Sequence, residues 1–498
     1  MQMAFQKDVI SCMQPLLRDT QTQEQTQEVR IGDGMPDIGR ILCCWGQVIL
    51  RGKEWDTDTA VVNGGTMAWV QYLPEEGGDP ETVACWLPFQ MRWNLPQTQQ
   101  EGILLTQVQL KSVDARSTSA RKMIIRTNVS VLLQAMETCQ KEISLPDGLP
   151  EDVQLHTLSY PVMLTAEAGE KTFSLDESFS LQGNGMQPEK LCAYWMQPQI
   201  TEYRLMGDKA VFRGNASLQT LYRSQDGKYF SGSYELPFSQ YSELESEYGD
   251  DADAVFWPAV TSLEAELEEG TIHVRAGLTG QYEIRSRPVI RVVTDAYSPC
   301  RDVELKQQLL ELPGILESKK QILHAKSNTP AEGIQAAAVQ FLSHGIAIAP
   351  TDTGAQLTLQ GNFQNLLYDL EGAPNACAGK WEQQLQIPMG EGCSIDARLL
   401  PTGIAQSTML SGQLQQQADL ILETDTRMNT GISMVTGLEL GELRQPDPDR
   451  PSLILRKAGA QSLWDLAKAS GATVEDIQKA NDLAGEPEPE QMLLIPVM

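Results

Sequence analysis

The side chains that most often catalyse reactions are scarce in this chain of 498 residues. Its four histidines are His156, His273, His324 and His344. They form no His-Glu-x-x-His motif and lie near no cysteine cluster, so their spacing predicts no zinc site. The chain also lacks the Gly-x-Ser-x-Gly motif that presents the serine of many hydrolases. The sequence therefore predicts a protein that is not an enzyme and that has no metal site.

Two glycine-containing segments invite comparison with nucleotide-binding loops. In residues 169–172, Glu170 stands between the glycine and the lysine, and the upstream glycine of a phosphate-binding loop is absent. Residues 32–34 (Gly-Asp-Gly) lack the third glycine of a dinucleotide-binding loop. Because phosphate recognition needs the complete glycine-rich turn, we expect no nucleotide and no other cofactor.

The chain is strongly acidic, with 38 Lys and Arg against 66 Asp and Glu and a net charge of −28. This charge repels phosphate backbones and anionic lipid, which argues against nucleic-acid binding and membrane insertion. The acidic run at residues 243–253 lacks the register of a calcium loop and is expected to be a solvated loop. Arg116, Arg121, Lys122 and Arg126 form a basic group, which is either a solvated strand face or a contact for an acidic partner.

The cysteine pattern is typical of reduced thiols, because the number is odd and no Cys-x-x-Cys occurs. The nine cysteines are Cys12, Cys43, Cys44, Cys85, Cys139, Cys192, Cys300, Cys377 and Cys393. We expect most of them to be small buried apolar side chains. No apolar run approaches the roughly 20 residues that span a bilayer, and residues 1–8 contain no apolar segment of a secretory signal. We therefore expect a cytoplasmic protein.

Three landmarks recur in the same order and at similar spacing, which indicates three copies of one module. They are a proline before an acidic and an aliphatic residue, a glycine followed by a tyrosine seven or eight residues later, and a proline between two apolar residues. In chain order they are Pro36, Gly64, Tyr72 and Pro88; then Pro188, Gly214, Tyr222 and Pro237; then Pro330, Gly361, Tyr368 and Pro388.

The runs around the landmark glycines predict β structure. Residues 61–72, 210–222 and 356–368 partly alternate apolar and polar side chains, which is typical of half-buried strands. A glycine inside such a run predicts a bulge or a close approach of two backbones. We therefore expect each module to be antiparallel β structure, either a sandwich or an open barrel.

The predicted fold class is mainly β, with three such modules followed by a small βααβ domain. The modules are expected at residues 1–152, 153–300 and 301–443. The third is the most divergent and is expected to begin with a connector helix over residues 303–316. Residues 444–452 contain three prolines and predict a linker.

Residues 453–498 have a different pattern. Short strands are expected at residues 453–456 and 492–496. Between them, Ser462 before Asp465 and Thr473 before Asp476 resemble capping boxes that begin two helices. Asn481 suits a left-handed residue at the end of the second helix.

Residues 462–468, 474–477 and 493–496, together with Asn481, resemble a LysM domain. The resemblance implies two helices on one face of a two-stranded sheet, and a groove that holds N-acetylglucosamine chains in that family. The implied groove residues are Ala460, Gln461, Ser462 and Leu463 on one side and Ala480, Asn481, Asp482 and Leu483 on the other. The family's Gly-Asp is replaced by Ala460-Gln461, and its glycine before the last strand by Glu490. These departures favour a protein partner over a sugar.

Two residues beside this groove have alternative interpretations. Trp464 is either a partner contact or a part of the small core. Leu463 borders the groove but is better explained as a core residue, because a domain of under 50 residues has little core to spare.

Residues 24–42 and the glycine-to-tyrosine strand after them resemble the SPOCS repeat of SipL-type clostridial spore-coat morphogenetic proteins, and the first copy matches best. The resemblance covers nearly the whole chain, since repeats followed by one LysM domain are the layout of that family. It implies a non-catalytic scaffold in the mother-cell cytoplasm, at the forespore surface. Its partners would be SpoIVA, the ATPase of the coat's basement layer, and other coat proteins. Several weak contacts on one chain would raise its effective concentration at a polymerised layer.

Two alternatives remain. One is a LysM protein that binds peptidoglycan at the cortex or cell wall. The other is an unrecognised hydrolase, against which the missing nucleophile argues.

Overall fold

The computed structural model describes residues 2–96, 102–181, 188–331, 335–369, 371–445 and 451–497. Strands make up most of the described chain, which confirms the mainly β fold class. Their pairing is antiparallel. We group the strands into three β units and a C-terminal unit, while the domain boundaries drawn from the sequence stay a prediction.

The strands of each β unit follow one another along the chain. The first β unit contains β2 (Gln6–Arg30), β3 (Ile38–Asp56), β4 (Thr59–Pro74), β5 (Glu81–Asn94), β6 (Ile103–Ser119) and β7 (Lys122–Leu145). The second contains β8 (Gln154–Pro161), β9 (Leu164–Ser180), β10 (Pro188–Ser224), β11 (Tyr229–Tyr248), β12 (Asp253–Glu268), β13 (Thr271–Ser286) and β14 (Val289–Tyr297). The third contains β15 (Val303–Pro330), β16 (Gln335–Thr351), β17 (Gly354–Tyr368), β18 (Pro374–Pro388), β19 (Ser394–Leu410) and β20 (Gln413–Leu440), and β1 (Gln2–Ala4) pairs with β20.

The three β units have the same pattern of strand pairing. The first unit has the sheets β2–β7–β6 and β3–β4–β5, and the third has β15–β20–β19 and β16–β17–β18. The second has β9–β13–β12 and β10–β11, with β8–β14 as a separate pair. Its long β10 turns back near Gly207 (φ 61°), so that Thr201 Oγ1 donates a hydrogen bond to the Arg213 carbonyl at 3.4 Å.

The predicted connector helix at residues 303–316 is wrong, because this segment begins β15. Leu310 and Leu312 are buried while Leu309 and Glu311 are exposed, which is the period of a strand. Pro313 has no N–H to offer a helix, whereas at its position in β15 it lies opposite Asn429 of β20.

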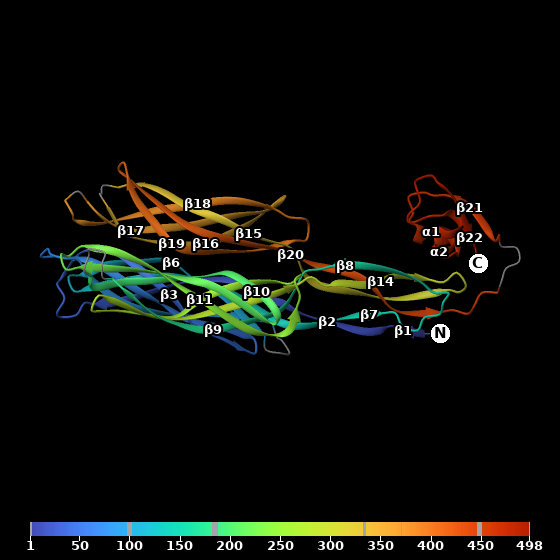
Figure 1. Ribbon diagram of the computed structural model, residues 1–498, viewed down its shortest axis with the longest axis horizontal. Coiled ribbons are helices and arrows are strands. Elements are labelled where there is room, and N and C mark those ends of the chain that lie inside the picture. Colours follow the sequence, from blue (N-terminus) through green and yellow to red (C-terminus); the bar gives the residue numbers. More distant parts are fainter. Residues whose placement is uncertain are drawn as a thin grey trace.

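The β units form a head, and three strand pairs extend from it as a stalk (Figure 1). The stalk pairs are β2–β7, β8–β14 and β15–β20, and its core draws on all three units. That core includes Cys12 and Ile143 from the first unit, Ile290 and Val292 from the second, and Leu310, Leu312, Ile432 and Met434 from the third. The C-terminal unit lies near the far end of the stalk, on the same side of the molecule as the N-terminus (Figure 1).

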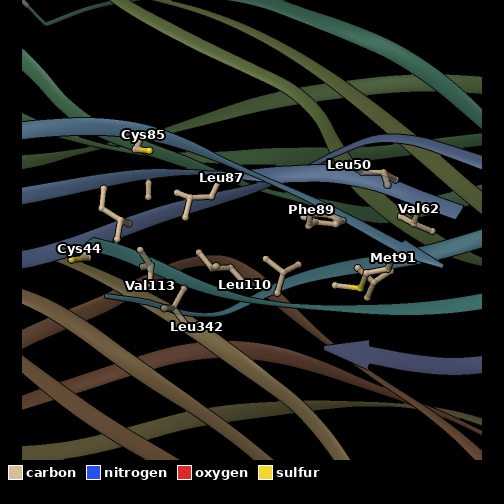
Figure 2. Close-up of a cluster of buried hydrophobic side chains, with 14 of the residues drawn as sticks. Cys44, Leu50, Val62, Cys85, Leu87, Phe89, Met91, Leu110, Val113 and Leu342 are labelled. Carbon is tan, nitrogen blue, oxygen red and sulfur yellow. The ribbon is translucent and has the colours of Figure 1, made fainter. Parts of the chain in front are cut away.

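Each β unit has its own sandwich core. In the first unit, Leu87 and Phe89 of β5 are buried in one cluster with Leu110 and Val113 of β6. Figure 2 shows these side chains between the two sheets, and Leu342 of the third unit lies at the edge of the same cluster. Since apolar burial is the main stabilising term in folding, this shared cluster couples the two units energetically.

The β units contact one another in a cycle. A strand of each unit contacts a strand of the next, through the pairs β3 with β12, β10 with β19, and β16 with β6. Glutamine side chains also bridge the first unit to each of the other two. Gln47 accepts a hydrogen bond from Met196 N at 2.7 Å, and Gln340 bonds to both the N–H and the carbonyl of Gly46, at 3.1 and 2.7 Å.

The landmark glycines occupy equivalent crowded places. A Cβ at Gly64 would collide with the Ile49 carbonyl, and a Cβ at Gly214 with the Gln199 carbonyl. A Cβ at Gly361 would collide with the Phe341 ring. The close backbone approach that the sequence predicted is therefore present at Gly64 and Gly214.

Two landmarks of the third copy do not correspond to the others. Pro388 lies opposite Gly354 at a strand end. In contrast, Pro88 and Pro237 lie across the sheet from the residue that follows the landmark glycine of their unit. Tyr72 and Tyr222 are buried in their own sandwich cores, but Tyr368 packs in a cluster between units, where its hydroxyl accepts a hydrogen bond from Tyr229 N. Tyr368 follows its landmark glycine one residue sooner than Tyr72 and Tyr222 follow theirs. Because successive side chains of a strand point to opposite faces, this shift by one residue places Tyr368 on the other face of the sheet.

Six charged side chains meet where the three units join, and we call them the junction network. They are Arg18 of β2, Glu283 and Arg285 of β13, Asp396 of β19, and Asp425 and Arg427 of β20. The closest pairs are Arg285 with Asp425 at 2.5 Å, Arg427 with Asp396 at 2.6 Å, and Arg18 with Asp396 at 3.2 Å. Arg285 and Glu283 are each 1% exposed.

The network depends on its carboxylates staying ionised. Burial alone would raise the pKa of Asp425, but the guanidinium groups of Arg285 and Arg427 hold that pKa at about 2. A carboxylate whose pKa is lowered by folding stabilises the folded protein at pH values above the usual pKa of the group. This contribution is lost as the pH falls from about 4 towards 2.

We expect Arg285→Met to destabilise the folded chain by about 3–5 kcal/mol, because Glu283 and Asp425 would stay buried without their closest cation. The matched control is Arg275→Met on the same strand. Arg275 pairs with Asp176 at the surface, with side chains 70% and 75% exposed, so its loss should cost under about 1 kcal/mol. The urea midpoint of the intrinsic fluorescence measures both. Equal midpoints for the two variants would contradict the buried network.

Candidate interaction site

The C-terminal unit contains the candidate residues. It consists of β21 (Leu453–Lys457), α1 (Leu463–Ser470), α2 (Val474–Asn481) and β22 (Met492–Pro496). The order is β-α-α-β, and β21 pairs antiparallel with β22. Leu463 is 2% exposed and packs with Leu466, Ile477 and Leu493. Of its two interpretations, Leu463 is therefore a core residue.

The helix caps follow the sequence expectation in part. Ser462 Oγ accepts a hydrogen bond from Asp465 N at 3.1 Å, and Thr473 Oγ1 accepts one from Asp476 N at 3.0 Å. Both hydroxyls also donate to the carboxylate of the same aspartate. The predicted left-handed end at Asn481 is wrong, because Asp482 holds that conformation with φ 50°.

The predicted groove residues divide into exposed and structural members. Ala460 and Gln461 in the first loop, and Ala480 and Asp482 at the second, are exposed, and Ser462 is half-buried as the cap of α1. The structural members are Leu463, Asn481 and Leu483.

Asn481 and Leu483 are engaged inside the unit. The Asn481 side chain bonds to both the N–H and the carbonyl of Leu494, at 2.7 and 2.6 Å, so it ties α2 to β22. Leu483 is half-buried against the core of the unit. These two residues therefore hold the second loop in place.

Glu486 joins the two sides of the predicted groove, and sequence reasoning missed it. Its Oε2 accepts a hydrogen bond from Leu463 N at 2.8 Å, at the start of α1. A carboxylate there is favoured by the helix dipole and by the free N–H groups of the first turn. The sequence shows Glu486 only as an acidic residue after the second helix. Its pairing with the Leu463 N–H could not be predicted, because the two residues meet only in the folded unit.

Trp464 is engaged within the molecule, in contact with the β8–β14 pair of the stalk. Its indole N–H donates a hydrogen bond to Asp295 Oδ2 at 2.8 Å. Its ring lies 4.8 Å from that of Tyr297, edge to face, and 5.0 Å from that of His156. The core alternative is correct in part, because Trp464 is partly buried against the core of the unit, and that core also includes Tyr297 of the stalk. The sequence did not predict the contact with the stalk.

Two further contacts complete the docking. Lys468 Nζ lies 2.8 Å from both oxygens of Asp295, and Tyr297 donates a hydrogen bond to the Ala472 carbonyl at 2.9 Å. Partial burial would raise the pKa of Asp295, but the hydrogen bonds from Lys468 and Trp464 hold it below its usual range. We call this set of contacts the stalk dock.

The outer face of the small sheet is apolar. Leu455 of β21 lies opposite Leu494 of β22, and they are 62% and 38% exposed. Leu453 and Met492 on the same strands are also exposed. This face lies outside the predicted groove and does not take part in the stalk dock.

The charged groups singled out in the sequence have structural explanations. Arg121 pairs with Asp37 at 2.6 Å and Lys122 with Glu28 at 2.7 Å, which favours a solvated strand face over a contact for an acidic partner. The predicted loop at residues 243–253 is wrong in its first part, because β11 continues to Tyr248. Its Glu245 N and Tyr248 hydroxyl both bond to Glu167.

The junction of the β units contains a cavity of about 200 Å³. Half of its polar lining consists of amides, those of Gln47, Gln107, Gln109, Gln197, Gln199 and Gln340. The lining also includes Lys320 and Glu423, which pair with each other at 3.0 Å. In the described chain, no group of three His, Cys, Asp or Glu side chains is placed to hold a metal ion, and no helix is long and apolar enough to cross a membrane.

Comparison with known families gives one match. The model of the family described as "SipL, SPOCS domain" matches residues 187–268. This segment spans β10, β11 and β12 of the second β unit, whereas we expected the best agreement in the first. No curated protein matches the chain. The match supports a sporulation-related protein of SipL type.

We expect Asp295→Asn to loosen the stalk dock, because the amide loses the charge that attracts Lys468. Hydrogen exchange in α1 should become roughly tenfold faster, corresponding to about 1.4 kcal/mol. Because the pKa of Asp295 is lowered by the dock, wild-type protein should show the same loosening only when the pH falls below about 4.

The control for this measurement is Glu142→Gln. Glu142 pairs with Lys7 on the exposed surface of the stalk, and its side chain is 54% exposed. The substitution should therefore leave hydrogen exchange in α1 unchanged. Slow exchange in the Asp295→Asn protein would show that the ion pair does not hold the unit.

Glu490 adopts the left-handed conformation, with φ 71°, at the position where a LysM domain has glycine. This conformation costs a residue other than glycine roughly 1–2 kcal/mol. The Glu490 pair with Lys457 is exposed and offsets at most about 1 kcal/mol.

We therefore expect Glu490→Gly to stabilise the C-terminal unit by up to about 1 kcal/mol. Slower hydrogen exchange of the β22 amides would report the gain. Glu488→Gly is the matched control in the same loop, since Glu488 is exposed and is not left-handed. An equal response of the two variants would exclude relief of backbone strain as the cause.

Proposed function

We propose that this chain is a non-catalytic scaffold of the spore coat, which tethers the coat to the forespore surface from the mother-cell cytoplasm. The observation that carries the proposal is the SPOCS match at residues 187–268. It supports the proposal because the matched strands belong to a pairing pattern that the first and third β units share. The proposal extends the SPOCS assignment from the second unit to all three.

We further propose that the C-terminal unit is a LysM domain that binds a protein, the SpoIVA-type ATPase of the basement layer. Its β-α-α-β order is that expected of LysM. The exposed loop residues Ala460, Gln461, Ala480 and Asp482 would form the contact. Leu463, Asn481 and Leu483 support these loops from inside.

The stalk dock limits which surface can meet the partner. While Trp464 donates to Asp295, its indole N–H is not free for another protein. A partner therefore either uses the exposed loops of the docked unit or must first break the dock. The first route costs no contact, and it is the one that we propose.

The test uses the full chain with two baits, SpoIVA from the same organism and insoluble peptidoglycan. We expect capture by SpoIVA alone. Ala460→Arg and Ala480→Arg place bulk and charge on the two loops and should each weaken capture at least tenfold, which is about 1.4 kcal/mol. Ala469→Arg, at the exposed far end of α1, should not.

The other outcomes decide against parts of the proposal. Capture by peptidoglycan that the two loop variants abolish would make the chain a sugar-binding LysM protein. Capture by SpoIVA that survives both loop variants would move the contact away from the loops. Release of reducing ends from peptidoglycan would show a hydrolase.

A further inference from the structure

Two of the cysteines lie directly opposite each other in the stalk. Cys12 of β2 and Cys139 of β7 are partners in the antiparallel register, and their sulfur atoms are 3.3 Å apart. The residues are 127 positions apart in the chain. No spacing rule could pair them, and from the sequence we expected only reduced, unpaired thiols.

The backbone geometry at this pair permits a disulfide. Opposed residues on antiparallel strands have Cα atoms roughly 4.5–5.5 Å apart, which lies inside the roughly 4.4–6.8 Å range of natural disulfides. A bond of about 2.0 Å therefore requires the two sulfur atoms to approach by side-chain rotation, without movement of either strand. Cys377, in contrast, lies opposite Asn365 and has no thiol across the strand.

The two thiols differ in the way that a reactive pair requires. Cys12 is fully buried in the stalk core, whereas Cys139 is partly exposed. A hydrogen bond from the Cys12 thiol and, to a smaller extent, the charge of Lys141 lower the pKa of Cys139 to about 7, against the opposing effects of burial and Glu137. The same contact and burial raise the pKa of Cys12. Cys139 is thus the accessible nucleophile, and Cys12 is placed to attack second.

We propose that Cys12 and Cys139 form an oxidation site that closes to an intramolecular disulfide when the protein meets a low-molecular-weight disulfide. The Cys139 thiolate attacks one sulfur of the oxidant, which forms a mixed disulfide and releases one thiolate. Cys12 then attacks the Cys139 sulfur, gives its proton to solvent base, and releases the second thiolate. Two protein thiols become one disulfide, and the oxidant takes up two electrons and two protons to become two thiols.

The bond would join the first and last strands of the first β unit. The loop that it closes contains β3, β4, β5 and β6, and therefore the whole β3–β4–β5 sheet. Closing a loop of this length restricts the unfolded chain, so the oxidised unit should resist unfolding more than the reduced one. The site would thus make the stability of the scaffold respond to the redox state of its surroundings, and this holds whether or not the chain acts in the spore coat.

The experiment uses the full chain, reduced and then exposed to oxidised glutathione under native conditions. We expect peptide mapping to recover a cross-linked peptide pair containing Cys12 and Cys139, lighter by two hydrogens, in most molecules. The thermal unfolding temperature should rise on oxidation and return to its first value after dithiothreitol. Cys12→Ala and Cys139→Ala should each abolish both effects, whereas Cys377→Ala should keep both.

Other results would overturn the proposal. Complete alkylation of Cys12 and Cys139 after the oxidant treatment would show that no disulfide forms. Glutathione could accumulate on Cys139 while Cys12 stays a thiol, which would mean that Cys12 does not resolve the mixed disulfide. A disulfide that forms only in urea would show that the native strands hold the sulfurs apart.

Discussion

The structure depends on a set of buried charges that all three β units contribute, in which the net charge of the first unit is balanced by that of the third. The junction network takes Arg18 from the first unit, Glu283 and Arg285 from the second, and Asp396, Asp425 and Arg427 from the third. The first unit alone would bury a net positive charge and the third a net negative one. Because an unpaired buried ion is costly, the first unit needs Asp396 of the third, and the second and third units are joined by the buried pair of Arg285 with Asp425.

The fold of the head explains how a chain of net charge −28 can bury ions at all. Its excess acids stay on the surface, where water and salt screen them. The buried set is neutral, and Gln134 satisfies Glu283 further with a hydrogen bond of 3.0 Å. The glutamine bridges at the other junctions carry no charge and so cost less to bury. The polar contacts between units therefore fix the order of the units around the head.

The sequence predicted what local chemistry determines. Gly64 and Gly214 could be identified because only glycine fits against a neighbouring carbonyl, and Ser462 and Thr473 because a cap bonds to an N–H three residues away. The local pattern of residues 303–316 favoured a helix, but this segment forms a strand because it pairs with β20. The partner of Trp464 could not be predicted, because Asp295 lies 169 residues away in the chain.

The stalk dock bears directly on how the chain would bind in the scaffold role that we propose. A module on a free linker loses rotational and translational freedom when it binds, which weakens each contact. Trp464, Lys468 and Tyr297 hold the C-terminal unit against the stalk. The exposed loops therefore keep a fixed direction relative to the head. Several such chains on one polymerised surface could then engage together, because the orientation of each loop is set before contact.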